Sequence, residues 1–389
     1  MNMKDTIYLD SAAATRPSEG VADFFSGTLS EYYANPDSSH AAGLAAKQQI
    51  ERARAAVAGV LNAQPGEIIF TSSGTEANNL AIFGTCDAHK RRGNKIITSD
   101  SEHPSVYMAV KELAKRGFEI IYLSAKGGVI NLDELKKALD GRVILISVMA
   151  VNNETGVIYD IKKITQTVGA AYKNAEFKPY IHCDGVQAFG KLDINLNKLK
   201  VDMFAASAHK IHGIKGAGFL YLRKGIRISP QLFGGMQERG LRSSAPNTPG
   251  ISAFGRAVEE INIKEDSKTV EALYDYTVQK IREQCPGVRF NQENAGILKY
   301  ILSIRLPNVR SEVMLNYLSS RGIYISSGSA CSSGNTAARE SQRVLLNYGL
   351  DRHTADFTVR VSFCKYNRKA EIDAFAAALA DGITKLAVY

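Results

Sequence analysis

Two side chains that follow apolar segments could together hold an aromatic cofactor. Asp184 comes directly after the apolar run 180–183, and Lys210 ends the segment 207–210 that follows the run 203–206. Because parallel strands end at one edge of a sheet, both side chains would face the same ligand there. Pyridoxal phosphate needs this pair: a lysine for a Schiff base and an aspartate beside the ring nitrogen. Each residue alone is better explained as a surface lysine or a turn residue, whereas the combination favours a cofactor site.

Residues 71–78 have the composition of a phosphate-binding turn. Small hydroxyl residues and Gly74 follow the apolar run 67–70, where a strand would give way to a helix. Free backbone N–H groups and the positive end of the helix dipole attract an anion at such a turn. Helix capping by Ser73 or Thr75 would favour the same residue types, so this segment alone leaves the two interpretations about even.

Other glycine and histidine motifs give weaker signals. Residues 185–192 have the spacing of a nucleotide-binding loop, but Leu192 stands where that loop needs a hydroxyl for magnesium, and we exclude it. His103 precedes a proline, and a helix start explains this fragment better than a ring-stacking proton carrier does. His209 and His212 lack a third ligand, so no metal site is predicted.

The five cysteines are widely spaced and include no C-x-x-C pair, so neither a disulfide framework nor a zinc site is predicted. Cys331 lies in the small-residue run 326–335, which predicts an exposed loop that could present and withdraw a thiol nucleophile. Cys86 and Cys183 have apolar neighbours and are expected to be buried. Arg360 lies between apolar residues, where it could clamp a carboxylate or belong to an ordinary strand face.

Apolar runs of strand length alternate with helix-period segments through the first two thirds of the chain. This alternation predicts an α/β protein with a mostly parallel sheet covered by helices on both faces. After a long helix over about 251–284, the pattern predicts a smaller α+β domain. The expected strands are 67–71, 95–99, 119–123, 143–149, 180–183, 203–206, 218–222, 300–306 and 323–326; the expected helices are 76–90, 105–116, 161–173, 311–320 and 369–387.

Length and composition fit a globular protein with two domains. The chain has 389 residues, of which 45% are hydrophobic and 22% charged, and this length exceeds what one core usually covers. We expect a large domain over 18–260 and a small domain made of 1–17 and 261–389. No run reaches the ~18 apolar residues of a membrane span, and residues 1–10 lack signal-peptide order, so a cytoplasmic protein that does not engage a membrane is expected.

The net charge of +9 raises the question of nucleic-acid binding. Residues 191–227 concentrate this charge, with eight Lys or Arg against two Asp. However, the chain has neither an aromatic-and-basic RNA signature nor a recognition-helix pattern. A solvated basic face that suits anionic small molecules or an acidic partner is favoured, and no direct nucleic-acid contact is expected.

Taken together, these motifs resemble the pyridoxal-phosphate cysteine desulfurases of the NifS/IscS type, which have the class V aminotransferase fold (aminotransferase fold type I). The resemblance covers almost the whole chain, from Ile7 to about Asp373. Its blocks occur in family order, which makes chance agreement implausible. They are residues 7–10, 35–40, 71–78, 101–104, 151–156, 207–210, 237–242 and 326–332.

The resemblance implies a role for each matching residue. Lys210 would bind the cofactor covalently, Asp184 would pair with its ring nitrogen, and His103 would stack on the ring and move protons. Cys331 would attack the sulfur of L-cysteine, which leaves a persulfide on the enzyme and releases alanine. The other implied contacts are Asn153 and Gln187 to the ring hydroxyl, Gly74, Thr75, Ser207 and His209 to the phosphate, and Asn35 and Arg360 to the substrate carboxylate.

The resemblance also implies partners. The serine-rich loop matches a group whose flexible cysteine passes sulfur to a scaffold, a carrier or a tRNA-thiolation enzyme, for iron-sulfur cluster assembly or for tRNA or cofactor thiolation. A homodimer is implied in the same way. The alternatives are a related class V enzyme, such as a selenocysteine lyase or an aminotransferase, and a non-catalytic sulfur-relay partner.

Three departures from the family pattern stand out. Residues 242–245 read Arg-Ser-Ser-Ala where the family usually has Arg-Ser-Gly-Thr, whose threonine reaches the cofactor phosphate of the other subunit. Ser243 or Ser244 could substitute for that hydrogen bond, which is worth roughly 1.5–3 kcal/mol. Cys364 replaces a usual glycine, and residues 335–343 lack a usual Glu-Pro. None of these changes removes a predicted catalytic group.

Overall fold

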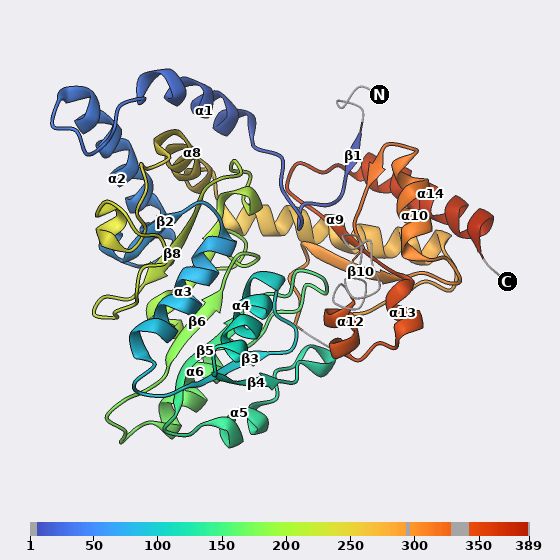
Figure 1. The fold of residues 1–389 in the computed structure, drawn as a ribbon. Coiled ribbons are helices and arrows are strands. Elements are labelled where there is room, and N and C mark those ends of the chain that lie inside the picture. The colour runs from blue at the N-terminus through green and yellow to red at the C-terminus, as the bar shows by residue number, and fades with distance from the viewer. Residues whose placement is uncertain (1–5, 293–295, 328–341, 388–389) are drawn as a thin grey trace.

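The computed structural model describes residues 6–292, 296–327 and 342–387, and its largest unit is a seven-stranded sheet. The strands are β2 (Ile68–Thr71), β3 (Lys95–Ser99), β4 (Glu119–Leu123), β5 (Val143–Met149), β6 (Tyr180–Asp184), β7 (Met203–Ser207) and β8 (Gly218–Leu222). They are arranged in the order β2-β8-β7-β6-β5-β3-β4 (Figure 1). β8 runs antiparallel to both of its neighbours, and the other six strands share one direction. The predicted mostly parallel sheet is therefore confirmed.

Alternating side chains divide the sheet into two buried faces. On β7, Met203 and Ala205 pack into one apolar cluster, whereas Phe204 packs into the other. The first cluster includes α3 (Gly74–His89) and α4 (Pro104–Lys115); the second includes α2 (Ala41–Leu61), α6 (Ile161–Ala171) and α8 (Thr248–Glu259). Because both faces are covered, β5 is buried along its whole length, and its sequence is almost entirely apolar. Shorter or flanking helices are α1 (Glu19–Glu31), α5 (Leu132–Ala138) and α7 (Leu196–Leu199).

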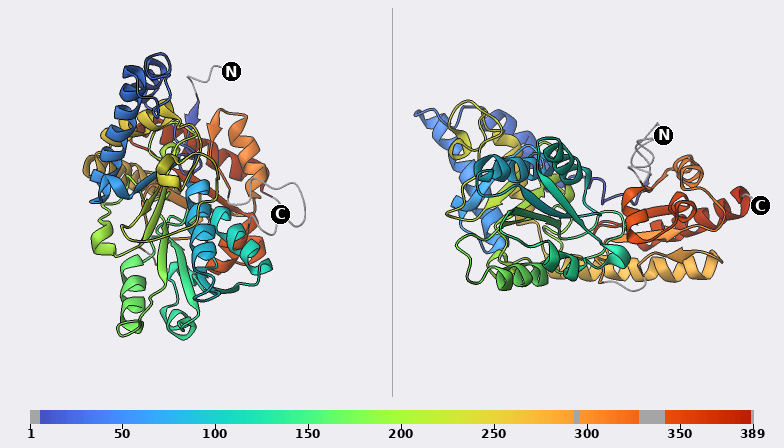
Figure 2. Two further views of the ribbon diagram at one scale, coloured as in Figure 1. Left: turned by 60° about the vertical axis from the view of Figure 1, so that its left-hand side comes forward. Right: turned by 60° about the horizontal axis from the view of Figure 1, so that its bottom comes forward.

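A second group of elements follows the large sheet. β9 (Arg289–Phe290), β10 (Ile301–Arg305) and β12 (Thr358–Ser362) form an antiparallel sheet in the order β12-β10-β9. The N-terminal β1 (Ile7–Tyr8) pairs with β11 (Ile323–Tyr324), so the start of the chain joins this group (Figure 2). Its helices are α9 (Ile263–Gln284), α10 (Ser311–Ser319), α12 (Arg343–Tyr348), α13 (Arg352–Asp356) and α14 (Lys369–Leu386). The domain boundary near residue 260 remains a prediction.

The long helix predicted over 251–284 is wrong. α8 ends at Glu259 and α9 begins at Ile263, because the Asn262 side chain accepts a hydrogen bond from the Glu265 backbone N–H at 3.3 Å and starts a new helix. No helix was expected where the structure has α1, α2, α5, α7, α12 and α13. The other predicted strands and helices agree with the structure to within two residues at each end. Within the described ranges, no helix is long and apolar enough to cross a membrane.

Gly185 allows the end of β6 to approach a buried ring. A Cβ atom at this position would lie 1.8 Å from Cζ of Phe204, which is fully buried. We expect Gly185→Ala to lower the free energy of unfolding by about 1–3 kcal/mol, because the ring and the strand must move apart. Chemical denaturation measures this. Gly141→Ala is the control, since its Cβ would meet nothing within 4 Å. Equal stability of the two variants would contradict the close packing.

Candidate active site

Ten of the twelve residues assigned to the site line one cavity of about 490 Å³. Strands β6 and β7 end at this cavity with Asp184 and Ser207, and the turn after β2 also reaches it. Asn35 does not line it, and Cys331 lies outside the described residues. The ten are Gly74, Thr75, His103, Asn153, Asp184, Gln187, Ser207, His209, Lys210 and Arg360.

The Lys210 amine is held at the cavity wall by two backbone carbonyls. Its Nζ donates to the oxygens of Ala12 and Ala13, both at 2.7 Å. Burial and then the Arg360 charge lower the pKa of Lys210 to about 8, while Asp10 and Asp184 oppose this shift. An amine with this pKa is partly neutral near pH 8, which is the form that attacks an aldehyde.

Asp184 presents a fixed carboxylate at the end of β6. Its Oδ2 accepts from Asn78 Nδ2 at 2.8 Å, and its Oδ1 accepts from the Val186 backbone N–H at 3.1 Å. The side chain is 5% exposed and Asn78 is 1% exposed. These two donors hold the carboxylate in one orientation, so it can receive a protonated ring nitrogen without rearrangement.

His103 both starts a helix and faces the cavity. It is the N-cap of α4, and its Nδ1 accepts from the Ser105 backbone N–H at 3.1 Å. Burial lowers the pKa of His103, so the ring is neutral near pH 7. Because Nδ1 accepts this bond, the ring proton of the neutral form is on Nε2. Helix capping and a site role are therefore compatible here.

The turn after β2 combines a helix cap with an open helix end. The Ser73 hydroxyl accepts from the Glu76 backbone N–H at 3.1 Å, which confirms the capping interpretation for Ser73. Ser73, Gly74 and Thr75 all line the cavity, where the first-turn N–H groups of α3 have no partner within the helix. A Cβ on Gly74 would lie 2.5 Å from Val186 Cγ2, so glycine keeps this turn close to β6. On the neighbouring strand end, Ser207 Oγ and His209 Nδ1 share a hydrogen bond of 2.8 Å.

Arg360 forms a buried wall of the cavity. It is 6% exposed; its Nη2 pairs with Asp10 Oδ1 and its Nη1 donates to the Asn153 carbonyl, both at 2.8 Å. Its buried Nε makes no hydrogen bond to the described residues. The backbone of Arg360 is bridged to Ser326, at the start of the serine-rich segment. A guanidinium held in this way presents a positive charge suited to a carboxylate.

Sequence reasoning missed several cavity residues. Asn78 and Arg343 line the cavity, where Asn78 donates to Asp184, and Asp10 pairs with Arg360 behind its wall. Arg343 donates to the carbonyls of Asp100 and Glu102, which fixes the start of α12 at the cavity. Asn78 carried a usable signal, because it is a polar residue one turn after Gly74 on a buried helix face.

Four cysteines lie in the described ranges, and none is an accessible thiolate. Cys86, Cys183 and Cys285 are buried, as predicted for the first two. Burial raises the pKa of the Cys285 thiol to about 11 and also raises those of Cys86, Cys183 and Cys364. A thiolate nucleophile in this chain is therefore best sought at Cys331.

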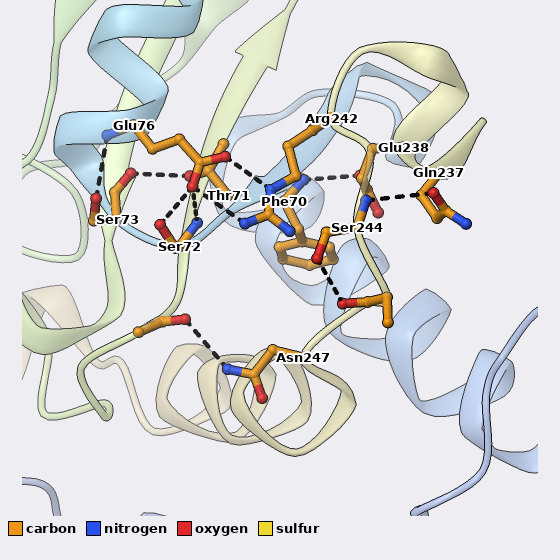
Figure 3. Close-up of polar contacts among 12 residues, drawn as sticks. Phe70, Thr71, Ser72, Ser73, Glu76, Gln237, Glu238, Arg242, Ser244 and Asn247 are labelled. Carbon is orange, nitrogen blue, oxygen red and sulfur yellow. Dashed lines mark hydrogen bonds and ion pairs between the residues drawn. The ribbon is translucent and has the colours of Figure 1, made fainter. Parts of the chain in front are cut away.

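The segment 242–245 lies beside the turn after β2, outside the Lys210 cavity (Figure 3). Arg242 Nε pairs with Glu76 Oε1 at 2.8 Å, and the Ser244 backbone N–H donates to Gln237 Oε1 at 3.3 Å. The segment lines a separate cavity of about 170 Å³ together with Ser72 and Asn247. Neither Ser243 nor Ser244 lines the Lys210 cavity within the same chain.

Comparison with known proteins assigns the chain to a family. A model of the class-V aminotransferases matches residues 7–375. The chain belongs to the class-V aminotransferase family. It is 40% identical over 370 residues to "Cysteine desulfurase 2" of Trichormus variabilis, covering 94% of this chain and 90% of that relative. It is 36% identical over 375 residues to "Cysteine desulfurase IscS" of Dictyoglomus turgidum, covering 95% and 93%.

Solved structures agree with this class-V assignment. A "NIFS-like protein" superimposes with a TM-score of 0.90 at 36% identity, covering 97% of this chain and 99% of the other. "SspA in complex with cysteine" gives a TM-score of 0.80 at 31% identity, covering 93% and 100%. The predicted fold, the pyridoxal-phosphate cofactor and the cysteine desulfurase function are thereby confirmed.

The donor set of the cavity fits pyridoxal phosphate. Lys210 offers an amine of lowered pKa for the aldehyde, and Asp184 offers a fixed carboxylate for the ring nitrogen. Gly74 and Thr75 offer first-turn N–H groups for the phosphate, and Ser207 and His209 offer a hydroxyl and a ring nitrogen beside them. A volume of about 490 Å³ lies within the usual range for small-molecule sites.

The lowered pKa of Lys210 predicts how cofactor uptake depends on pH. The neutral amine becomes the main form as pH rises through about 8, so the rate of uptake by the apoprotein should rise below pH 8 and level off above it. For a lysine of ordinary pKa, about 10.4, the fraction of neutral amine would keep rising with pH beyond pH 9. Stopped-flow absorbance of the apoprotein mixed with pyridoxal phosphate measures this. A rate that still climbs between pH 9 and 10 would show that burial does not lower this pKa.

Proposed function

We propose that this protein removes sulfur from L-cysteine, releases L-alanine and carries the sulfur as a persulfide on Cys331. The observation that supports this best is the meeting of Lys210, Asp184 and Arg360 in one cavity whose wall includes Ser326 and Ser327. Cys331 follows Ser327 by four residues, so the covalent chain keeps its Cα within about 14 Å of a residue that lines the cavity.

Arg360 is proposed to bind the carboxylate of L-cysteine. Asp10 and the Asn153 carbonyl fix the guanidinium, so the positive charge is in place before the substrate arrives. When bound, pyridoxal phosphate supplies an electron sink that stabilises negative charge at the substrate Cα. Asp184 supports that sink by keeping the ring nitrogen protonated.

Two groups are proposed to move protons. The neutral Lys210 amine could accept a proton from the substrate Cα, because its pKa is already lowered. His103 lines the same cavity and could exchange a proton with the substrate through Nε2, because Nδ1 is engaged by the Ser105 backbone N–H. Both side chains are half-buried at the cavity wall, which limits the loss of the transferred proton to water.

The sulfur step is proposed to use the Cys331 thiolate as nucleophile. The thiolate attacks the substrate sulfur, a sulfur–sulfur bond forms, and the substrate carbon–sulfur bond breaks. The electron pair of that bond stays with the substrate carbon, which takes up a proton to become the methyl group of alanine. The persulfide is then passed to an acceptor, for which we propose a scaffold, a carrier or a tRNA-thiolation enzyme in the cytoplasm.

We also propose that the chain acts as a homodimer. Tyr33, Phe233 and Met236 are large apolar side chains that are 78%, 84% and 78% exposed, which is typical of a protein interface. Gln237 Nε2 donates to Asp37 Oδ2 at 3.0 Å, so the segment after α1 and the 230–245 segment lie side by side. Asn35 belongs to this surface, and a role in substrate binding would require it to reach the partner's cavity.

The test of the proposed function is sulfide release from L-cysteine. Cys331→Ala should lower the rate at least a hundredfold, because no described cysteine provides an accessible thiolate, while absorbance of the bound cofactor is retained. Cys364→Ala is the matched control and should keep the parent rate. Mass spectrometry should find a mass gain of one sulfur atom on the Cys331 peptide.

A Cys331→Ala variant that releases sulfide at the parent rate would contradict the proposal. Loss of cofactor absorbance in Lys210→Ala, with the fold retained, serves as an independent check on the cofactor site. The same assay with L-selenocysteine separates a desulfurase from a selenocysteine lyase, because the latter would release selenide but little sulfide. A parent protein that binds the cofactor but releases neither would favour an aminotransferase.

A further inference from the structure

Lys191 is a buried lysine close to the proposed cofactor site. It is 7% exposed and forms no ion pair with any residue that the structure describes. Its side-chain contacts there are a hydrogen bond to Gln187 Oε1 at 3.1 Å and the ring of Tyr300, whose centroid lies 5.8 Å from Nζ. Burying an ammonium group without a carboxylate partner costs free energy, so the burial of Lys191 requires an explanation.

A hydrogen-bonded chain connects Lys191 to Lys210. Lys191 Nζ donates to Gln187 Oε1, and Gln187 Nε2 donates to the Ala12 carbonyl at 2.8 Å. The same carbonyl accepts from Lys210 Nζ at 2.7 Å. Lys191 and Lys210 also line a second cavity of about 30 Å³, which has room for about one water molecule.

This series of hydrogen bonds determines the orientation of the Gln187 amide. In its ammonium form Lys191 has donors and no acceptor, so only the oxygen of the amide can face it. In its neutral form the amine still donates to that oxygen, and the Ala12 carbonyl, which can only accept, favours the same orientation. The NH₂ group must then face Ala12 and the large cavity, which Gln187 lines. Without Lys191, the two orientations of the amide would differ less in energy, and the flipped one would turn an acceptor towards the Ala12 carbonyl.

We propose that Lys191 is a positioning residue, which holds the Gln187 amide with Nε2 directed to the cofactor site. This inference rests on the proposed contact between Gln187 and the cofactor ring hydroxyl. A purely structural role for Lys191 is disfavoured, because an ammonium without an acidic partner contributes little to stability at this depth. Its burial, which lowers the pKa of Lys191 to about 7, and the nearby Lys210 charge both oppose its protonated form.

A double-mutant cycle on the apoprotein tests this role. The dissociation constant of pyridoxal phosphate is measured for the parent, Lys191→Met, Gln187→Ala and the double variant. Lys191→Met should weaken binding on the order of tenfold, as expected when one hydrogen bond is lost. In the Gln187→Ala background, Lys191→Met should cause no further loss, because Lys191 acts through Gln187.

Three controls separate positioning from general damage. The first control is Lys365→Met. Lys365 also lines the 30 Å³ cavity, but it pairs with Asp266 and does not contact Gln187. This variant should keep the dissociation constant of pyridoxal phosphate within about twofold of the parent value. Lys191→Gln keeps a donor and should retain most of the affinity. The apoprotein of Lys191→Met should melt no lower than the parent, because the change removes a lone buried charge.

The inference would be overturned if Lys191→Met weakened pyridoxal-phosphate binding equally in the parent and in Gln187→Ala. It would also be overturned if Lys191→Met did not weaken binding in the parent. Should Lys191→Met fail to fold, the same cycle is run with Lys191→Leu, which also removes the donor and must then show coupling to Gln187 and not an independent loss. Failure of the parent apoprotein to bind pyridoxal phosphate would instead overturn the proposed cofactor site, so the two failures are distinguishable.

Discussion

The site depends on one carboxylate held at the end of a buried strand. Asp184 closes β6, and donors from Asn78 and from the next turn bind its two oxygens. The Lys210 amine lines the same cavity and is held by the Ala12 and Ala13 carbonyls. We propose that a planar cofactor would be bound at one end by the amine and at the other by the carboxylate, which would leave it a single orientation. The other groups of the cavity would act on the substrate in relation to that orientation.

Burial gives these polar groups their chemical properties. It lowers the pKa of Lys210 towards neutral pH, so this amine can exchange protons there, and it lowers the pKa of His103, so that ring is neutral at pH 7. It also raises the pKa of Glu102, beside His103, to about 8, so this carboxyl adds little negative charge to the cavity at pH 7. The sheet can bury such groups because helices cover both of its faces and its apolar strands hold the polar residues at one edge.

Much of this arrangement follows from local sequence patterns. Apolar runs followed by Asp184 and by Ser207–Lys210 predicted strand ends and hence a shared edge, because sheet topology leaves parallel strands few alternatives. Partners supplied by distant segments were not predictable in this way: Asp10 reaches Arg360, and Asn78 reaches Asp184, only through the tertiary fold. The break between α8 and α9 was missed because one side-chain cap at Asn262 outweighed a continuous helical pattern. Lys191 lies in residues 185–192, whose spacing is that of a nucleotide-binding loop, and its burial depends on packing that no local pattern shows.

The most direct test of the central claim is nuclear magnetic resonance of the protein loaded with pyridoxal phosphate that carries ¹⁵N at the ring nitrogen. Asp184 is predicted to keep that nitrogen protonated, so its chemical shift should be that of a pyridinium throughout the neutral pH range and that of a neutral pyridine in Asp184→Asn. An unprotonated ring nitrogen in the parent protein, or a shift that Asp184→Asn leaves unchanged, would contradict the account.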